Sequence, residues 1–500
     1  MIFRLFLLGL LLVANLPNMM GQEKVQLVYS DNIYYSKKLV DAQRVIGNVH
    51  FEREGNHLYC DSAYWYDNRD FKAFGKIKIV KPGDYTLTGN ELFYRNEENK
   101  AYLNGNAVLV DENMTLTAPK MDYQLSQKWA SYSGGGKIVS SQKKNTLISQ
   151  RGTYNTETGI SFFEKNVQLQ NDQYTLRTEK LKYDNLKEVA HFIAPTTIVS
   201  KTERLTCSKG FYQTRTEYCE MFDHPLVISN SQKLSADTIY FNGQAGWGKA
   251  HSHVVIHDTL ENKWVTGGYG EYHEKEKVQW VTKTPQYFHR METDTLLLKA
   301  DTLWMQQDSL LGDRVKAYHS ASFFHPDFQG VGDSIVFQSS DSTLHFYKMP
   351  ILWAGARQIT GDSMYVEIKN NNPYRFFVRS NSMIIGQTVA NDTSYFDQIK
   401  GRDVVGFFQD GQLYRIDIKG NGQLIYFPLE KEDSKAPIGL NKADCSNISV
   451  LVKDRKIRQI ALKKEPDSHF IPEQQTKGEV KKLKGFSWLE EQRPLRQQFQ

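Results

Sequence analysis

The sequence predicts an all-β protein: an elongated antiparallel β-jelly-roll, arranged as a V-shaped solenoid trough and built from repeats of about 29 residues. The main observation is an eight-residue pattern, clearest at Leu87 to Tyr94, that recurs at this period along the chain. Between copies, short runs of alternating apolar and polar residues are separated by two polar turn zones, which is typical of antiparallel strands. An aromatic content of 12%, together with many Val, Ile and Thr residues, also favours strands over helices.

Each copy of the pattern opens on an apolar residue, continues with small or polar residues, and closes on an aromatic or apolar residue. Clear copies start at Leu58, Leu87, Leu116, Leu147, Leu176, Leu205 and Leu234. Weaker copies start at Val28, Val265, Leu298, Gly330, Ile359 and Ile399. A stacked array of such units forms one continuous body however long it becomes.

Each repeat should supply two arms, and each arm should bend midway, because it is longer than the usual strand of roughly 5–6 residues. Glycine or proline stands at the expected bends, since these residues commonly mark bends and bulges inside strands. One arm has such residues at Gly75, Gly105 and Gly134 to Gly136, and the other has them at Gly89, Pro119 and Gly152.

Residue parity supports the bend. Leu87 lies an odd number of residues from Leu92 and Tyr94, so a straight strand would place it on the opposite face. A bend near Gly89 would let all three side chains face inward.

Stacked bent arms would form two facing sheets with apolar rows along their inner faces. If the trough is closed, these rows are an ordinary core; if it is open along one side, they form a groove for a long apolar ligand. The predicted lining comprises Ile77, Ile79, Leu92, Tyr94, Val108, Val110, Val167, Leu169, Leu181, Tyr183, Ile198, Leu226 and Ile228.

The chain divides into four parts. Residues 1–21 carry a basic start and an apolar run that is too short for a membrane span, and they are interpreted as a signal peptide. Residues 22–205 hold the regular repeats, and residues 206–427 hold a looser half continuous with them. Residues 428–500 are expected to be a connector, a last hairpin around Asp454 and Arg455, and a charged tail with an amphiphilic stretch at 483–489.

Charge and motifs exclude several functions. The net charge of +5 is mild and well mixed, which argues against nucleic acid as a partner. The sequence has no Ser-His-Asp elbow, phosphate-binding loop or His-Glu-x-x-His motif, so neither an enzyme nor a cofactor is expected. His251, His253 and His257 form the best metal-like cluster, but only Asp258 stands nearby, and a solvent-facing polar row is the favoured interpretation.

Cys60, Cys207, Cys219 and Cys445 are interpreted as buried free thiols. Export would permit disulfides, and a bridge between Cys207 and Cys219 is left open.

The repeat unit resembles the OstA-like family of periplasmic bridge proteins in lipopolysaccharide transport. The residues that carry the resemblance are Gly75 to Tyr94, Gly105 to Tyr123 and Leu234 to Phe241, and the pattern extends over about residues 25–427. The chain looks like the long stand-alone members found in the Bacteroidota. The resemblance implies a trough that shields lipid A acyl chains in the periplasm or at the outer membrane. It also implies end-to-end strand addition to other Lpt proteins, including the outer-membrane translocon.

Two functions from different classes follow. The first is binding and transfer of lipopolysaccharide toward the outer membrane within a transenvelope bridge. The alternative is an exported repeat scaffold with a closed core, whose outer faces bind carbohydrate or protein. Self-association is left open.

Overall fold

The computed structural model describes residues 25–35, 42–141, 145–290, 294–308, 312–369, 372–389, 392–409, 412–431, 434, 436–453, 456–476 and 478–499. The predicted signal peptide lies outside these residues. The chain forms two compact units: unit 1 comprises residues 1–172 and 179–186, and unit 2 comprises residues 173–178 and 187–500. No helix in the described part of the chain has the length and apolarity to cross a bilayer.

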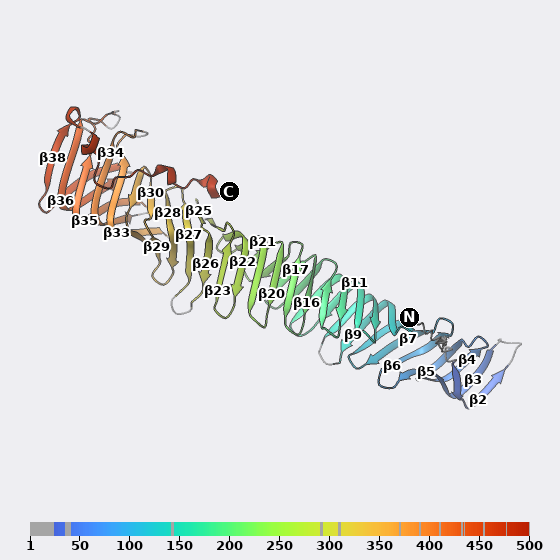
Figure 1. Ribbon diagram of the computed structural model, residues 1–500. Coiled ribbons are helices and arrows are strands. Elements are labelled where there is room, and N and C mark those ends of the chain that lie inside the picture. The colour runs from blue at the N-terminus through green and yellow to red at the C-terminus, as the bar shows by residue number, and fades with distance from the viewer. Residues whose placement is uncertain are drawn as a thin grey trace, which may run out of the picture. The chain divides into compact units, whose positions relative to one another are not determined.

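Unit 1 consists of antiparallel strands, each paired mainly with its neighbours in sequence (Figure 1). The strands are β1 (Gln26–Tyr29), β2 (Asn32–Tyr35), β3 (Ala42–Arg53), β4 (Asn56–Tyr66), β5 (Phe71–Lys81), β6 (Tyr85–Arg95), β7 (Lys100–Asp111), β8 (Met114–Gln124), β9 (Trp129–Ser140), β10 (Thr146–Asn155), β11 (Ile160–Gln170) and the second part of β12 (Tyr174–Asp184). The fold-class prediction of an all-β antiparallel protein is therefore confirmed.

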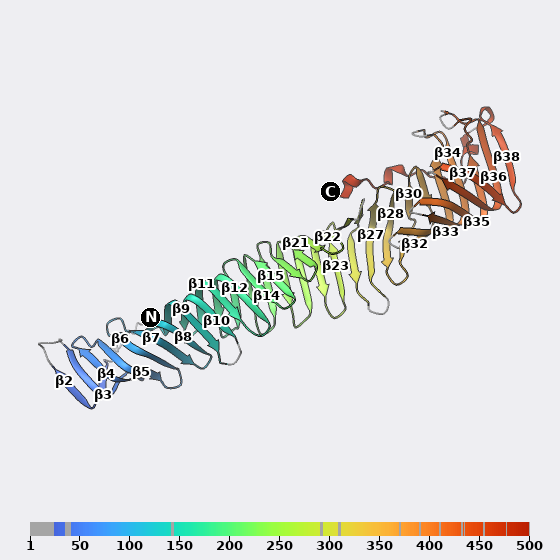
Figure 2. The same cartoon turned by 180° about the vertical axis from the view of Figure 1, so that it is seen from behind.

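Unit 2 continues the same plan, but many of its arms are divided into two short strands (Figure 2). Its first strands are β13 (Val189–Phe192), β14 (Thr196–Ser200), β15 (Glu203–Cys207), β16 (Lys209–Gln213), β17 (Tyr218–Phe222), β18 (Leu226–Ser229), β19 (Gln232–Ser235), β20 (Thr238–Asn242), β21 (Trp247–Asp258), β22 (Lys263–His273), β23 (Val278–Thr282), β24 (Gln286–Arg290), β25 (Thr295–Lys299) and β26 (Thr302–Gln306). The later strands are β27 (Arg314–Phe324), β28 (Phe328–Gln338), β29 (Thr343–Tyr347), β30 (Ile351–Ala354), β31 (Arg357–Thr360), β32 (Ser363–Lys369), β33 (Asn372–Gln387), β34 (Phe396–Gln409), β35 (Gln412–Tyr426), β36 (Gly439–Lys453), β37 (Lys456–Lys463) and β38 (Asp467–Pro472).

Every arm crosses between two half-sheets. Half-sheet A ends at turns such as residues 54–55 and 82–84, and half-sheet B ends at turns such as residues 67–70 and 96–99. In unit 2 the division is explicit, because β14, β15, β18 and β19 pair with one another while β13, β16, β17 and β20 form a separate ladder. We call the side bordered by the two rows of turns the mouth, and the bends opposite it the corner.

The corner is made by pairs of consecutive residues with positive φ. In unit 1 these pairs are Gly47–Asn48, Gly75–Lys76, Gly105–Asn106, Gly134–Gly135 and Lys165–Asn166. The strand register shifts at the same places. The expected bends at Gly75, Gly105 and Gly134 are thus present.

The bend in β6 places Leu87, Leu92 and Tyr94 on one buried side, with exposures of 0%, 2% and 4%. Gly89 itself does not have a positive φ. A Cβ at Gly89 would lie 3.1 Å from Cδ2 of Leu103, so glycine there permits the close approach of β7.

The repeat ladder extends beyond Phe427. β36 pairs with β35, and the predicted last hairpin is formed by β36 and β37. β36 begins at Gly439, so the connector after Phe427 ends there. The turn residues Asp454 and Arg455 lie outside the described residues.

The C-terminal segment 478–499 lies on the outer face of half-sheet A in unit 2 (Figure 1). We call it the strap; it contains the 3₁₀ helices η2 (Gly478–Lys481), η3 (Glu490–Gln492) and η4 (Arg496–Phe499), and η1 (Glu473–Gln475) precedes it. Leu483, Phe486 and Trp488 complete a small core with Ile385, Phe396 and Ile425. The amphiphilic stretch at 483–489 therefore packs on the array itself.

Candidate functional site

The last residue of the repeat motif has very different exposure in the two units. In unit 1, Tyr94, Tyr123 and Tyr154 occupy this position and are 4%, 0% and 1% exposed. In unit 2, Phe241 and Tyr272 occupy it and are 38% and 41% exposed, while Tyr212 is half-buried and packs against Tyr174 with 5.6 Å between ring centroids. One sequence position is therefore buried in three copies of unit 1 and exposed in two copies of unit 2.

Aromatic rings close the mouth of unit 1. Tyr85 of half-sheet A lies 4.8 Å, between ring centroids, from Tyr123 of half-sheet B, and Phe51 lies 4.9 Å from Phe71. The Tyr123 hydroxyl is 3.2 Å from Oγ1 of Thr156, and the Tyr85 hydroxyl donates to Asn56 over 2.7 Å. Buried tyrosines of this kind exclude water while their hydroxyl groups stay paired.

Burial also changes the acidity of these tyrosines. Desolvation disfavours the phenolate and raises the pKa of Tyr123 to about 12. The pKa values of Tyr85 and Tyr154 are likewise raised, chiefly by burial. For Tyr94, burial raises the pKa and the nearby Arg53 guanidinium partly offsets this rise. The sealing hydroxyls therefore remain protonated donors at neutral pH.

Half-sheet A of unit 2 carries a row of apolar side chains that keep partial contact with solvent. The register pairs Ile198 with Leu205, Leu205 with Val227, Val227 with Leu234, and Leu234 with Ile256. All five are half-buried. The row joins buried residues at both ends, because Ile198 pairs with Leu176, which is 0% exposed, and Ile256 pairs with Val265, which is 6% exposed.

Half-sheet B supplies the other side of this interior. Phe241 and Tyr272 both pair with Gly248, which has no side chain to fill the space between them. Nearer the corner, small or medium residues close the floor: Ala236, Ala250, Val254 and Cys207 are all buried. We call the region lined by Ile198, Leu205, Val227, Leu234, Ile256, Phe241 and Tyr272 the unit 2 trough.

Seven of the thirteen residues predicted to line the trough are buried: Ile77, Ile79, Leu92, Tyr94, Val167, Leu169 and Leu181. Tyr183 and Ile198 are half-buried, and Ile198 belongs to the unit 2 trough. The structure does not gather these residues into one site, because the first seven lie in the packed core of unit 1.

Four predicted lining residues face outward instead. Val110 is 41% exposed, and Val108 pairs with Thr88 and Thr117, whereas the inward neighbours Ala107 and Leu109 are 0% exposed. The corner at Gly105–Asn106 sets this register, and valine on the outer face reflects β-propensity rather than burial.

The same inversion affects Leu226 and Ile228. After the positive-φ pair Asp223–His224, Pro225 and Val227 turn inward. Ile228 pairs with Arg204 and Lys233 on the outer face.

The interior of unit 2 also contains residues that are absent from the predicted lining. Leu205 and Leu234 open their motif copies, and Phe241 and Tyr272 close theirs. These residues could therefore have been found from the sequence, because they occupy the first and last positions of the repeat motif.

The three histidines do not converge. A corner at Ser252–His253 separates His251 from His253, so the two side chains do not share a strand face. His253 Nδ1 lies 2.8 Å from Oδ2 of Asp237, while His251 packs against Tyr269. Among the described residues, no group of three potential ligands is placed to hold a metal ion. All four cysteines are free.

Comparisons with known proteins support the resemblance over part of the chain. Residues 22–179 and 164–237 match a family model described as "OstA-like protein", which confirms the similarity to that family in this region. No curated protein matches the chain.

Nine solved chains match, and one of them is LptH from Pseudomonas aeruginosa, described as the LptA homologous periplasmic component of the lipopolysaccharide transport device. It is 15% identical, the match covers 23% of this chain and 79% of LptH, and the TM-score is 0.20.

Proposed function

We propose that the protein binds the acyl chains of lipopolysaccharide in the unit 2 trough and passes the lipid toward the outer membrane, as a periplasmic part of a transenvelope bridge. The observation that carries the proposal is the continuous row of half-buried apolar side chains from Ile198 to Ile256. The OstA-like match, which ends at residue 237, supports lipopolysaccharide as the class of ligand.

The physical basis is the cost of exposing a hydrocarbon chain to water. Each methylene that leaves water gains roughly 0.8 kcal/mol. Because neighbouring strands lie roughly 4.8 Å apart, the five row residues present apolar contact at every step of an extended chain. A chain can therefore move along equivalent positions without full exposure, and an energised partner elsewhere must supply the direction.

The partners of this proposal are other Lpt proteins of the same fold, including the outer-membrane translocon. The edge strands β1 and β2 pair with β3 and carry exposed apolar residues: Val28 is 55% exposed, Ile33 56% and Tyr34 57%. An exposed apolar strand edge suits strand addition by a second chain.

The test is photo-crosslinking from paired positions on β20. A benzoyl-phenylalanine at Phe241 faces the trough, while one at Tyr240 pairs with Lys249 on the opposite face and serves as the matched control. We expect a lipopolysaccharide adduct from position 241 and only background from position 240. Equal adducts at both positions, or none at 241, would contradict the proposal.

A second candidate function is the scaffold with a closed core. The sealed interior of unit 1 favours it, as does an outer row of alternating cations and aromatic residues in which Arg44 pairs with Tyr64 and Lys72 pairs with Phe93. Depletion of the protein separates the two candidates. Transport predicts that lipopolysaccharide accumulates in the inner membrane, whereas a scaffold leaves it at the cell surface.

A further inference from the structure

Three polar bridges between side chains cross the mouth in the described part of unit 1, each joining a turn region of half-sheet A to one of half-sheet B; a fourth contact runs from the Arg69 guanidinium to the Val25 carbonyl over 3.2 Å. Arg53 at the end of β3 donates to the Tyr94 hydroxyl and, over 3.2 Å, to Asn96 Oδ1. Tyr94 in turn donates to Asn99 Oδ1 over 2.9 Å. Arg53, Tyr94 and Asn99 are all at most 6% exposed, so this bridge is shielded from water.

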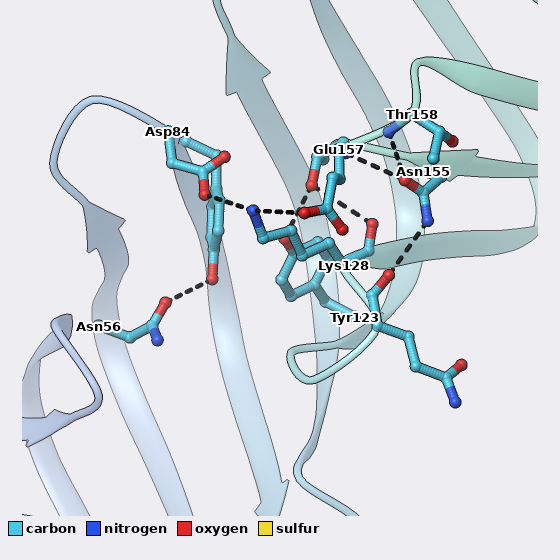
Figure 3. Close-up of polar contacts among 10 residues, drawn as sticks. Asn56, Asp84, Tyr123, Lys128, Asn155, Glu157 and Thr158 are labelled. Atoms are coloured by element: carbon cyan, nitrogen blue, oxygen red, sulfur yellow. Dashed lines mark hydrogen bonds and ion pairs between the residues drawn. The ribbon is translucent and has the colours of Figure 1, made fainter.

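The second bridge is ionic. Lys128 in the turn after β8 places its Nζ 3.4 Å from Oδ2 of Asp84, which lies in the turn before β6. Figure 3 shows Lys128 between Asp84 and Glu157, and the Glu157 carboxylate is 3.8 Å from the same Nζ. Tyr123 lies beside this pair, so the ionic bridge covers the aromatic seal formed by Tyr85 and Tyr123.

The third bridge joins β10 to β7. Tyr154 donates to Oδ2 of Asp111 over 2.5 Å. The other carboxylate oxygen of Asp111 accepts the backbone N–H groups of Asn113 and Met114, each over 2.8 Å. The Asp111 side chain is therefore fixed by its own turn while it holds the tyrosine from the opposite half-sheet.

The bridges repeat with a regular spacing. The partners of the first are 41 residues apart and those of the third 43 residues apart, which is close to one and a half repeats. Each therefore links a turn of half-sheet A to the turn region of half-sheet B that lies diagonally across the mouth. In unit 2, Phe241 at the equivalent position has no hydroxyl with which to form such a bridge, whereas Tyr212 and Tyr272 keep theirs.

We propose that these three bridges act as a latch that keeps lipid out of the interior of unit 1, and that unit 1 takes up acyl chains only when the latch is broken. The inference rests on the proposed function, because it concerns which part of the interior receives the lipid. An acyl chain can enter sideways only between the two turn rows, where the bridges and the aromatic rings beneath them now lie. Breaking the bridges removes the charge-assisted contacts that oppose separation of the turns.

The test uses lipopolysaccharide with a photoreactive group on an acyl chain and maps the labelled peptides by mass spectrometry. In the wild-type protein we expect label in β18 to β22 of unit 2 and only background in β6 to β10 of unit 1. The variant Arg53→Met/Asp84→Asn/Tyr154→Phe breaks all three bridges, and label in unit 1 should rise several-fold while label in unit 2 stays constant.

A charge exchange controls for the possibility that label enters unit 1 only because a variant is misfolded. Asp84→Lys alone places two cations together, and adding Lys128→Glu restores an ion pair of opposite polarity. Both are made in a Glu157→Gln background, because Glu157 would otherwise repel the new carboxylate. The single reversal should raise label in unit 1, and the exchange should return it to the level of Glu157→Gln alone.

The outcomes separate the two proposals. Absence of label from unit 2 in the wild-type protein contradicts the proposed function. Label in unit 2 together with equal label in unit 1 of the wild-type protein overturns the latch and leaves the function standing. Label in unit 1 that is unchanged in the bridge variants also overturns the latch.

Discussion

Tyr123 and Phe241 occupy the same position of the repeat motif but have opposite environments. Tyr123 is 0% exposed and lies between Tyr85 and Thr156, whereas Phe241 is 38% exposed beside Gly248. Both lie on antiparallel strands of the same architecture. The repeat therefore determines the direction of the side chain, while the turns and neighbouring residues determine whether the interior is closed.

The difference has a local cause in each unit. In unit 1 the half-sheets are joined by long side chains that meet across the mouth, such as Arg53 with Tyr94. In unit 2 a glycine stands between Phe241 and Tyr272, and the opposite row is aliphatic. Burial and solvent access therefore differ between copies of one repeat.

The largest expected effect comes from deleting equivalent leucines in the two interiors. Leu87 is 0% exposed and Leu234 is half-buried, and both open a motif copy. Leu87→Ala should lower local stability by about 3 kcal/mol, and Leu234→Ala by about 1 kcal/mol, because only the first leaves a sealed cavity. Hydrogen exchange of the amides in β6 and β19 measures both. Equal losses of local stability in Leu87→Ala and Leu234→Ala would contradict the distinction between a packed core at Leu87 and an open trough at Leu234.

The next effect concerns the tyrosine hydroxyl in the first bridge. Tyr94→Phe leaves Arg53 and Asn99 without their shared partner in a buried site and should cost about 1–3 kcal/mol. The reciprocal change Phe241→Tyr adds a hydroxyl where water is accessible and should stay within about 0.5 kcal/mol. Denaturant unfolding of each variant checks the pair. A neutral Tyr94→Phe would show that the hydroxyl does not stabilise the seal.

A pH effect should distinguish the sealed tyrosines. Burial raises the pKa of Tyr123 from 10.0 to about 12, so the unfolded chain loses its proton at lower pH than the folded one. The stability that Tyr123 contributes is therefore fully present below pH 10 and is lost as pH rises through about 12. Thermal unfolding between pH 9 and pH 12 should show this decline, and Tyr123→Phe should reduce its slope. If the slope of stability against pH is the same in Tyr123→Phe, then Tyr123 does not cause the decline.

A smaller effect is expected on the outer face of unit 2, where the strap covers strands whose inner face is packed, with Ile359, Ile384 and Ile399 all buried. Gln358 is 0% exposed; its Nε2 donates to the Ser487 carbonyl and its Oε1 accepts the Leu489 N–H, each over 2.7 Å. Gln358→Ala should loosen the strap locally by about 1–2 kcal/mol. Protease cleavage within residues 478–499 reports this change, and the exposed Gln232→Ala is the matched control. Equal cleavage in both variants would argue against this anchor.

The sequence is sufficient to predict the repeat, the strand class and the corners at Gly75, Gly105 and Gly134, but not those at Gly47–Asn48 and Lys165–Asn166. Period and parity are local properties, so the sequence alone places Leu87, Leu92 and Tyr94 on one side of a bent strand. The prediction that Val108 and Val110 line the interior is wrong, because the corner at Gly105–Asn106 turns Ala107 and Leu109 inward instead. Two positive-φ residues in succession change which following side chain faces inward.

The difference between the two interiors could not be predicted in the same way. It depends on residues that are distant in sequence, such as Asp84 with Lys128 and Asp111 with Tyr154. Each side chain alone is typical of an ordinary turn or strand residue. Only the diagonal arrangement of the turn rows brings them together across the mouth.

The most direct test of the contrast is hydroxyl-radical footprinting of the unmodified protein, with oxidation quantified at each aromatic side chain. We expect slow oxidation of Tyr94, Tyr123 and Tyr154, fast oxidation of Phe241 and Tyr272, and protection of the latter two when lipopolysaccharide is added. Equal oxidation at all five positions, or protection by lipid only at the three unit 1 tyrosines, would contradict a sealed unit 1 and an open trough in unit 2.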